Sequence, residues 1–288
     1  MHFQWYPGHM TKAKRMMQEN IKLIDLIIEL VDARVPLSSR NPDIDELGKN
    51  KARLIILNKS DLAEERWNEA WTEYFKKKGF HVVKVNSRKG GGVKSVQSVI
   101  QEACKAKIER DRKRGILNRP VRAMVVGIPN VGKSTFINSL AGKTAAKTGN
   151  KPGVTRGNQW IKIDKQLELL DTPGILWPKF DDEAIGMKLA CVGSISDEVL
   201  NMQEIAYHLL SYGKANYNQL FEARYGAVPQ PDDERDNEIV LWMENIARQR
   251  GCLKRGAETD FDKVSAQITD DFRSGRIGKV SLEVPKQA

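Results

Sequence analysis

Short apolar runs that end in polar loops alternate with amphipathic segments over the first 170 residues of the chain. An apolar run of this kind, bounded by turn-forming residues, is typical of a strand buried in a sheet. The runs predict strands at 26–31, 52–57, 81–85, 121–126, 159–164 and 166–170, the last two as a hairpin. Apolar positions at helical spacing predict helices at 11–24, 63–78, 92–114 and 133–140. Because strands alternate with helices, we expect an α/β fold with a mostly parallel sheet and flanking helices.

The strand pattern stops after Pro178. Residues 181–274 are predicted to form about five helices, including 198–212 and 232–250. We therefore expect an α/β domain at 1–178 and a small all-α domain at 179–288. No apolar run approaches the roughly 20 residues that span a bilayer, and residues 1–7 do not resemble a secretory signal.

The three cysteines, Cys104, Cys191 and Cys252, lie far apart and include no CxxC pair. This usage favours reduced thiols in a cytoplasmic protein over a zinc site.

Charge is distributed unevenly along the chain. The net charge is +10, yet residues 181–288 carry 13 Lys and Arg against 19 Asp and Glu, so the excess of basic residues lies before them. Basic residues concentrate in the first helix and in a connector that leads into the strand at 121–126: Lys12, Lys14, Arg15 and Lys22, then Lys105, Lys107, Arg110, Arg112, Lys113, Arg114, Arg119 and Arg122. Such surfaces favour an RNA partner, although charge alone fits a merely solubilising surface equally well.

A glycine-rich sequence follows the strand at 121–126 and opens the next helix. Residues 127–134 read Gly-Ile-Pro-Asn-Val-Gly-Lys-Ser and match the P-loop pattern GxxxxGK[ST]. Glycines let the backbone curl so that its N–H groups point at phosphate oxygens, and the helix N-terminus favours negative charge. We expect Lys133 to reach the β- and γ-phosphates and Ser134 to bind Mg²⁺. Nucleotide contacts are expected from Asn130, Val131, Gly132, Lys133, Ser134 and Thr135.

A second motif, Asn58-Lys59-Ser60-Asp61, ends the strand at 52–57 and matches NKxD. The Asp61 carboxylate can accept hydrogens from guanine N1 and the 2-amino group, which adenine lacks. The stem of Lys59 can cover the base, and Asn58 can brace the loop. Asn86 and Ser87 follow the next strand, where backbone contact with the guanine O6 is expected.

Two further segments are candidates for sensing the γ-phosphate. Asp171-Thr172-Pro173-Gly174 ends the predicted hairpin, so that Asp171 can bind a magnesium-ligated water and the Gly174 N–H can contact the phosphate. Thr155, between the P-loop helix and the hairpin, is the candidate switch residue that ligates Mg²⁺ and supports catalysis.

Together these motifs resemble the translation-factor-related GTPases, but their order is rearranged. In this chain NKxD precedes the P-loop by about 70 residues, which is typical of a circularly permuted GTPase. Trp5-Tyr6-Pro7-Gly8-His9-Met10 and Val31-Asp32-Ala33-Arg34-Val35-Pro36 resemble the bacterial ribosome biogenesis GTPase A family, also called YlqF. The resemblance covers nearly the whole chain. It implies a cytoplasmic GTPase that binds GTP and GDP and helps to mature the large (50S) ribosomal subunit by binding its precursor and ribosomal RNA.

Two positions raise the question of how hydrolysis is promoted. Many relatives carry Gln directly after DxxG to orient water, whereas this chain has Ile175 and Leu176. His9 is the candidate water-positioning residue, with a capping or core histidine as an equal alternative. Asn130 is a candidate K⁺ ligand, and an ordinary polar loop residue explains it at least as well.

The leading hypothesis is thus a ribosome-stimulated, RNA-binding GTPase of large-subunit assembly, monomeric and without a DNA or membrane partner. The alternative is a GTP-dependent module that regulates a protein partner. A metabolic P-loop kinase is disfavoured by NKxD and Asp171–Gly174. In the acidic C-terminal part, basic side chains could still touch RNA locally: Lys254, Arg255, Arg273, Arg276 and Lys279.

Overall fold

The structure is a computed structural model, which describes residues 8–146, 158–177, 180, 182–231, 233 and 237–285, with side chains from residue 10 onward. Its contacts form two compact units, residues 1–186 with 281–288 and residues 187–280. Each unit is described by itself below.

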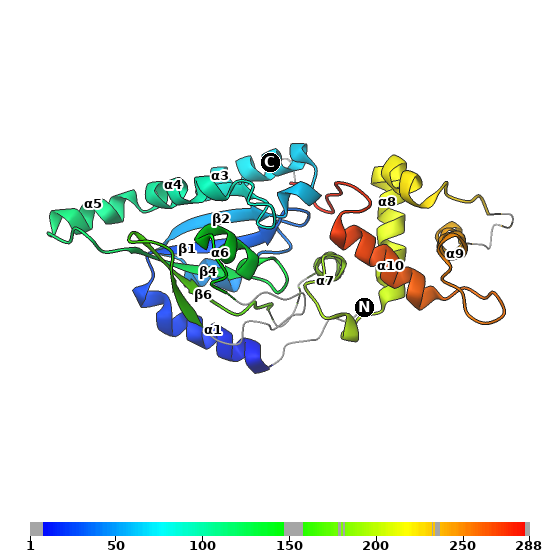
Figure 1. The fold of residues 1–288 in the computed structure, drawn as a ribbon, viewed down its shortest axis with the longest axis horizontal. Helices are drawn as coiled ribbons and strands as arrows, with labels where there is room; N and C mark the ends of the chain where they lie inside the picture. Colours follow the sequence, from blue (N-terminus) through cyan, green and yellow to red (C-terminus); the bar gives the residue numbers. More distant parts are fainter. Residues whose placement is uncertain are drawn as a thin grey trace. The chain divides into compact units, whose positions relative to one another are not determined.

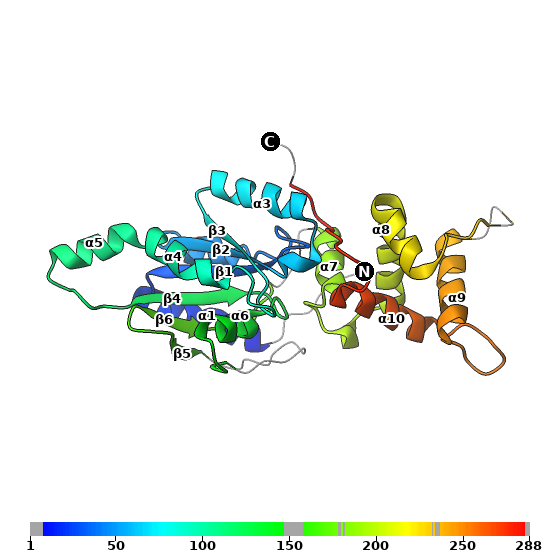
Figure 2. The same ribbon diagram turned by 45° about the horizontal axis from the view of Figure 1, so that its top comes forward.

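The first unit contains a six-stranded sheet in the order β3-β2-β1-β4-β6-β5 (Figure 1). Its strands are β1 (Leu26–Asp32), β2 (Ala52–Asn58), β3 (His81–Val85), β4 (Val121–Gly127), β5 (Gln159–Lys162) and β6 (Leu167–Asp171). All neighbouring pairs are parallel except β5 with β6, whose antiparallel pairing forms one edge of the sheet (Figure 2). The predicted mostly parallel sheet and its hairpin are confirmed.

Helices and short helical turns connect these strands. They are α1 (Gly8–Asn20), η1 (Ile21–Leu23), α2 (Asp43–Leu47), η2 (Ser60–Leu62), α3 (Glu65–Lys77), α4 (Val93–Ala103), α5 (Lys105–Lys113) and α6 (Lys133–Ala141). α4 and α6 contact each other, and α3 packs against β2 and β3.

The prediction of one continuous helix at 92–114 is wrong, because two helices, α4 and α5, occupy this range. The helical segment is interrupted at Cys104, whose backbone angles are φ −100° and ψ 6°. The apolar face of α4, formed by Val93, Val96 and Ile100, ends there, and α5 has no buried residue. With no apolar face to continue against the sheet, nothing holds the second helix in line with the first.

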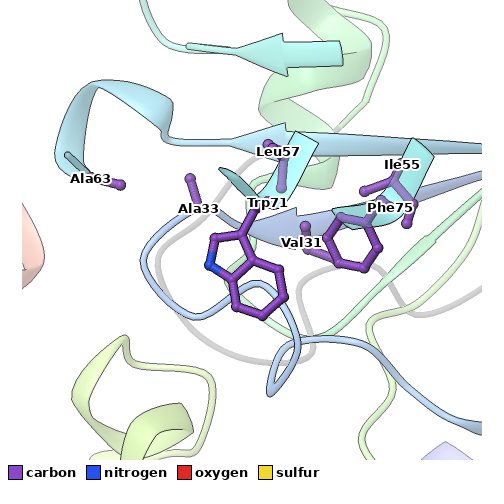
Figure 3. Close-up of a cluster of buried hydrophobic side chains, with 7 residues drawn as sticks. All are labelled: Val31, Ala33, Ile55, Leu57, Ala63, Trp71 and Phe75. Atoms are coloured by element: carbon purple, nitrogen blue, oxygen red, sulfur yellow. The ribbon is translucent and has the colours of Figure 1, made fainter. Parts of the chain in front are cut away.

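Two aromatic residues of α3 form part of the core. Trp71 and Phe75 are buried and stack with ring centroids 5.7 Å apart. They cover alternate residues of β1 and β2 (Figure 3), in a cluster of Val31, Ala33, Ile55, Leu57, Ala63, Trp71 and Phe75. These side chains share one face of the sheet because successive strand residues point to opposite faces.

The second unit is helical. α7 (Glu183–Cys191) leads into it, followed by η3 (Asp197–Val199), α8 (Met202–Tyr225), α9 (Glu238–Arg250) and α10 (Phe261–Ser274). α8 and α9 begin later than predicted because capping side chains determine their first residues. Asn201 accepts from the N–H groups of Gln203 and Glu204, and Asn237 caps α9 in the same way. Within the described residues, no helix has the length and apolar character needed to cross a bilayer.

The last described residues return to the sheet-containing unit. The Ser281 hydroxyl accepts from the Glu64 N–H at 3.2 Å, and the Trp71 indole N–H donates to the Glu283 carbonyl at 3.1 Å. Figure 2 shows this red segment running beside α3. The predicted division after residue 178 assigned these residues to the helical domain. The compact units instead divide after Gly186 and return the tail to the first unit.

Candidate functional site

The loop between β4 and α6 is shaped by two glycines (Figure 1). Gly127 has φ +155°, and a Cβ there would lie 2.7 Å from the Leu30 carbonyl oxygen. Gly132 has φ +99°, and a Cβ there would lie 2.5 Å from the Asn58 amide nitrogen. Any larger residue would be strained and would clash at both positions, so the tight curl of the loop depends on glycine.

Lys133 opens α6 and is buried. Its ammonium donates to the carbonyl oxygens of Gly127 and Ile128, both at 3.0 Å, so it lies within the curl of the loop. Burial lowers the pKa of Lys133 to about 8, while the charge of Asp171 acts in the opposite direction. A buried cation here is suited to an anionic ligand, whose charge would offset the cost of burial. Ser134 and Thr135 follow it in the first turn and are half-buried.

The segment after β6 lies against the same loop. The Thr172 hydroxyl donates to the Val125 carbonyl at 2.7 Å. A Cβ on Gly174 would lie 2.9 Å from both the Lys133 ammonium nitrogen and the Pro129 Cα. Only a residue without a side chain allows this approach, so Gly174 brings its backbone to the Lys133 ammonium.

Asp171 is the residue for which a magnesium-linked role is predicted. Its Oδ1 is buried and has no hydrogen-bond partner among the described residues. Burial raises the pKa of Asp171 to about 6, although the Lys133 charge and the Thr172 N–H lower it. An unpaired carboxylate oxygen of this kind can accept from metal-bound water. Among the described residues, no group of three His, Cys, Asp or Glu side chains is placed to hold a metal ion.

Asn58 connects three loops through one side chain. Its amide nitrogen donates to the Val131 carbonyl of the P-loop at 2.8 Å. Its Oδ1 accepts from the Ser87 N–H at 3.2 Å and from the Ser87 hydroxyl at 2.7 Å. The loops after β2, β3 and β4 are therefore held together, as parallel strands that end at one edge allow.

The rest of the NKxD segment forms a left-handed turn into η2. Lys59 has φ +57°, and its ammonium donates to Asp32 Oδ2 at 2.9 Å. Asp61 lies in η2 and is exposed. The Asn86 side-chain oxygen accepts from the Lys89 N–H within its own loop at 3.0 Å.

The remaining predicted residues are described only in part. Thr155 lies outside the described residues, and His9 is described only as backbone of α1. Asn130 has the left-handed φ of +57°. Ile175 and Leu176 are buried, so the two residues that follow Gly174 pack as core side chains.

Sequence reasoning did not assign a role to Asp32, Arg34 or Glu283. Strand register is what indicates a role for Asp32. In the parallel pair of β1 and β2, Asp32 lies opposite Asn58, the residue before Lys59. The motif with Arg34 was visible, and its ion pair with Asp32, two residues earlier, is local, but its contact with the Leu282 N–H comes from a distant part of the chain. Glu283 contacts residues about 245 positions earlier, a distance at which no local pattern predicts contact.

Comparison with known proteins agrees with this arrangement. Residues 122–225 match the family described as 50S ribosome-binding GTPase. The chain is 47% identical to the ribosome biogenesis GTPase A of Bacillus cereus, over 100% of this chain and 95% of that protein. It is 34% identical to the protein of the same name from Thermotoga maritima, over 98% of this chain and 94% of that one.

Solved structures are similar over the same extent. The crystal structure of GNP-bound YlqF from T. maritima has a TM-score of 0.67 and 29% identity, covering 96% of this chain and all of that one. The GDP-bound structure has a TM-score of 0.65 and 28% identity, covering 94% and 99%.

Proposed function

Because the chain belongs to the ribosome biogenesis GTPase A family, we propose that it binds GTP, hydrolyses it to GDP and phosphate, and acts in assembly of the large ribosomal subunit. The observation that carries the nucleotide part is the Asn58 side chain, which hydrogen-bonds both Val131 and Ser87. It joins the loop Asn58–Asp61 after β2, which we call the base-reading loop, to the P-loop, so one ligand can contact both. A guanine nucleotide has a base for the first loop and phosphates for the second.

The proposed phosphate site consists of the P-loop backbone, the Lys133 ammonium and the Gly174 N–H. The residues available for Mg²⁺ are Ser134, Thr155 and, through water, Asp171, whose buried Oδ1 has no partner among the described residues. The ion would neutralise charge that develops on the phosphates. Lys133 contributes a fixed positive charge beside the same oxygens.

The proposed base site consists of Asn58, Lys59, Asp61, Asn86 and Ser87. Asp61 would accept from guanine N1 and the 2-amino group, and the Lys59 stem would cover the base. Asp61 is exposed, so its carboxylate is open to a ligand that arrives from solvent.

Hydrolysis needs a group that orients water, and the buried Ile175 and Leu176 have no polar side-chain atom for that task. We propose His9 for this role, with K⁺ beside Asn130 as a further source of positive charge. A capping or packing role for His9 and an ordinary loop role for Asn130 are the alternatives.

For the ribosomal partner, the exposed basic residues of the connector without a described ion pair lie in α5 and directly after it. Lys107 and Arg119 are paired with Asp25 and Asp111, and Arg122 with Glu168. Five basic residues are exposed, and no described carboxylate pairs with them: Lys105, Arg110, Arg112, Lys113 and Arg114. We propose that this segment contacts ribosomal RNA of the subunit precursor through phosphates, with the protein acting as a cytoplasmic monomer.

GTP turnover with and without purified large ribosomal subunits tests the proposed function. We expect the subunits to stimulate hydrolysis and the protein to co-sediment with them in GTP but not in GDP. Lys133→Ala should abolish turnover. GTP-dependent binding to a protein partner without subunit binding would favour the regulatory alternative, and turnover retained by Lys133→Ala would refute the P-loop assignment.

A further inference from the structure

One buried carboxylate lies beneath the base-reading loop and binds two cations. Asp32, at the end of β1, is 1% exposed. Its Oδ2 accepts from the Lys59 ammonium at 2.9 Å and from Arg34 Nη2 at 2.8 Å. Its Oδ1 accepts from Arg34 Nε at 2.9 Å and from the Arg34 N–H at 3.1 Å. The carboxylate therefore fixes the far end of the Lys59 side chain from below the loop.

Arg34 and Lys59 keep the Asp32 carboxylate ionised. Burial alone would raise the pKa of Asp32, but the positive charges and hydrogen bonds of Arg34 and Lys59 hold it well below its usual range. A buried ion pair of this kind contributes little net stability, and buried ionic groups are better known for fixing one arrangement. The left-handed backbone of Lys59 is uncommon for a residue with a side chain, so its surroundings must hold it in place.

Arg34 is held in turn by the end of the chain. We call residues 281–285 the C-terminal strap. The Leu282 N–H donates to the Arg34 carbonyl at 2.9 Å. The Glu283 carboxylate accepts from the Leu37 N–H at 2.6 Å and the Ser38 N–H at 3.0 Å, and from the Ser38 hydroxyl at 2.6 Å. With the indole of Trp71 bound to the Glu283 carbonyl, the strap holds the loop after β1 against α3.

We propose that Asp32 is a positioning residue for guanine recognition: it anchors the Lys59 ammonium so that the lysine stem is ordered before the base arrives, and the C-terminal strap holds Arg34 and the loop that carries it. This inference rests on the proposed role of Lys59 at the base. A free lysine side chain would lose rotamer entropy when a base covers it, and an anchored one has already lost it. This entropic gain concerns only the base, which GTP and GDP have in common. We therefore expect it to increase the affinities for GTP and GDP equally.

A double-mutant cycle in nucleotide affinity tests this proposal. Asp32→Asn should weaken GTP and GDP binding by the same factor, about three- to tenfold. Lys59→Ala should weaken both as well. The double variant should be no weaker than Lys59→Ala alone, because Asp32 acts only through the lysine.

Glu29→Gln is the matched control. Glu29 lies on the same strand, is equally buried, and pairs with Arg40 and Arg53 rather than with the base-reading loop. The Glu29→Gln variant loses one buried negative charge, as Asp32→Asn does. We therefore expect the thermal stability of the variant to fall and its nucleotide affinity to stay at the wild-type value. If Asp32→Asn fails to fold, Glu283→Ala replaces it, with a smaller affinity loss that again disappears in the Lys59→Ala background.

The outcomes separate the inference from the function it rests on. If Lys59→Ala weakens binding but the losses of Asp32→Asn or Glu283→Ala add to it fully, the positioning role is refuted and the base site stands. If Glu29→Gln lowers nucleotide affinity as much as Asp32→Asn does, the effect of Asp32 is one of general stability, and the positioning role is refuted. Unchanged affinity in Lys59→Ala would refute both this inference and the proposed base site.

Discussion

At the scale of single residues, Asp61 is the residue proposed to select guanine over other bases. Asp61→Asn replaces an acceptor pair with an amide, which can donate to the 2-oxo group of xanthine but no longer pairs correctly with guanine. We expect GTP affinity to fall by roughly 10- to 100-fold, the effect of a lost hydrogen bond to a charged group, and XTP affinity to rise. Competition binding with GDP, GTP and XTP measures this. Unchanged affinities for all three would remove Asp61 from the base site.

Lys133 and Asp171 should set the pH range of nucleotide binding. Burial lowers the pKa of Lys133 to about 8 and raises the pKa of Asp171 to about 6. The ammonium attracts phosphate only when protonated, so affinity should decline above about pH 8, by about tenfold per pH unit. The carboxylate serves Mg²⁺ only when deprotonated, so the magnesium-dependent part of affinity should decline below about pH 6.

GDP titrations between about pH 5 and 10, with and without Mg²⁺, check both limbs. The alkaline decline should be missing in Lys133→Met, which has no titrating ammonium. The acidic decline should be missing when Mg²⁺ is omitted. A profile that is unchanged by either treatment would show that other groups set the pH dependence.

At the scale of secondary-structure elements, one carboxylate joins the three long helices of the second unit. Asp271 on α10 accepts from Arg224 of α8 at 2.9 Å and from Arg250 of α9 at 2.9 Å. Burial opposes its charge, but hydrogen bonds from Arg224 and Arg276 lower the pKa of Asp271 to about 2. A pKa below the value of an unfolded Asp, about 4, stabilises the folded unit above that pH. The contribution is lost as the pH falls from about 4 to 2.

Asp271→Asn should therefore lower the free energy of unfolding of this unit at neutral pH by about 2 kcal/mol. Urea unfolding, followed by hydrogen exchange in α8, α9 and α10, measures the difference between variant and wild type. That difference should shrink as the pH approaches 2. Asp262→Asn, an exposed position on the same helix whose carboxylate accepts from Gln203 but from no arginine among the described residues, is the control and should have a smaller effect. An equal loss in both variants would contradict the proposed role of Asp271.

At the scale of the whole molecule, ion pairs within the chain neutralise part of the basic surface that is proposed to bind RNA. Two of the basic residues of the connector pair with Asp25, and its exposed basic residues without a described ion pair lie in α5 and directly after it. Arg110→Glu with Arg114→Glu should weaken binding to large subunits about tenfold at low salt. The slope of log affinity against log salt should become shallower by about one to two, since phosphate contacts are lost.

Lys76→Glu with Lys77→Glu is the control for net charge. These exposed residues end α3 and make the same change in total charge at another place. Binding reduced to the same degree in both double variants would indicate a diffuse charge effect. Binding that is indifferent to salt and to the α5 reversals would show that this segment is only a solvated helix end.

The permuted chain order is also a property of the whole molecule. β4, which carries the P-loop, is the fourth strand in sequence and lies inside the sheet between β1 and β6. The base-reading loop comes earlier in the chain but ends at the same edge, two strands away. A nucleotide site depends on which loops lie at the same edge of the sheet and not on their order in the chain. The rearranged order is therefore compatible with the proposed site.

Local patterns predicted most of the sheet and the chemistry of its loops. Alternation, strand length and turn residues determine where strands such as 81–85 begin and end. The P-loop and NKxD motifs predicted a phosphate loop and a base loop because each needs particular residues at fixed spacing, as Gly127 and Gly132 illustrate for the P-loop. These features depend on neighbours within a few positions, so the sequence alone contains them.

Only the tertiary structure decided which distant residues support that site. The pairing of β1 with β2 brings Asp32 level with Asn58 and thus to Lys59, and strand order is absent from any local pattern. The return of Glu283 to the loop after β1 depends on a contact about 245 residues apart. The break at Cys104 reflects where the apolar face of α4 ends. Long-range contacts are selected by how whole elements bury their surfaces together, so they appear only once the chain has folded.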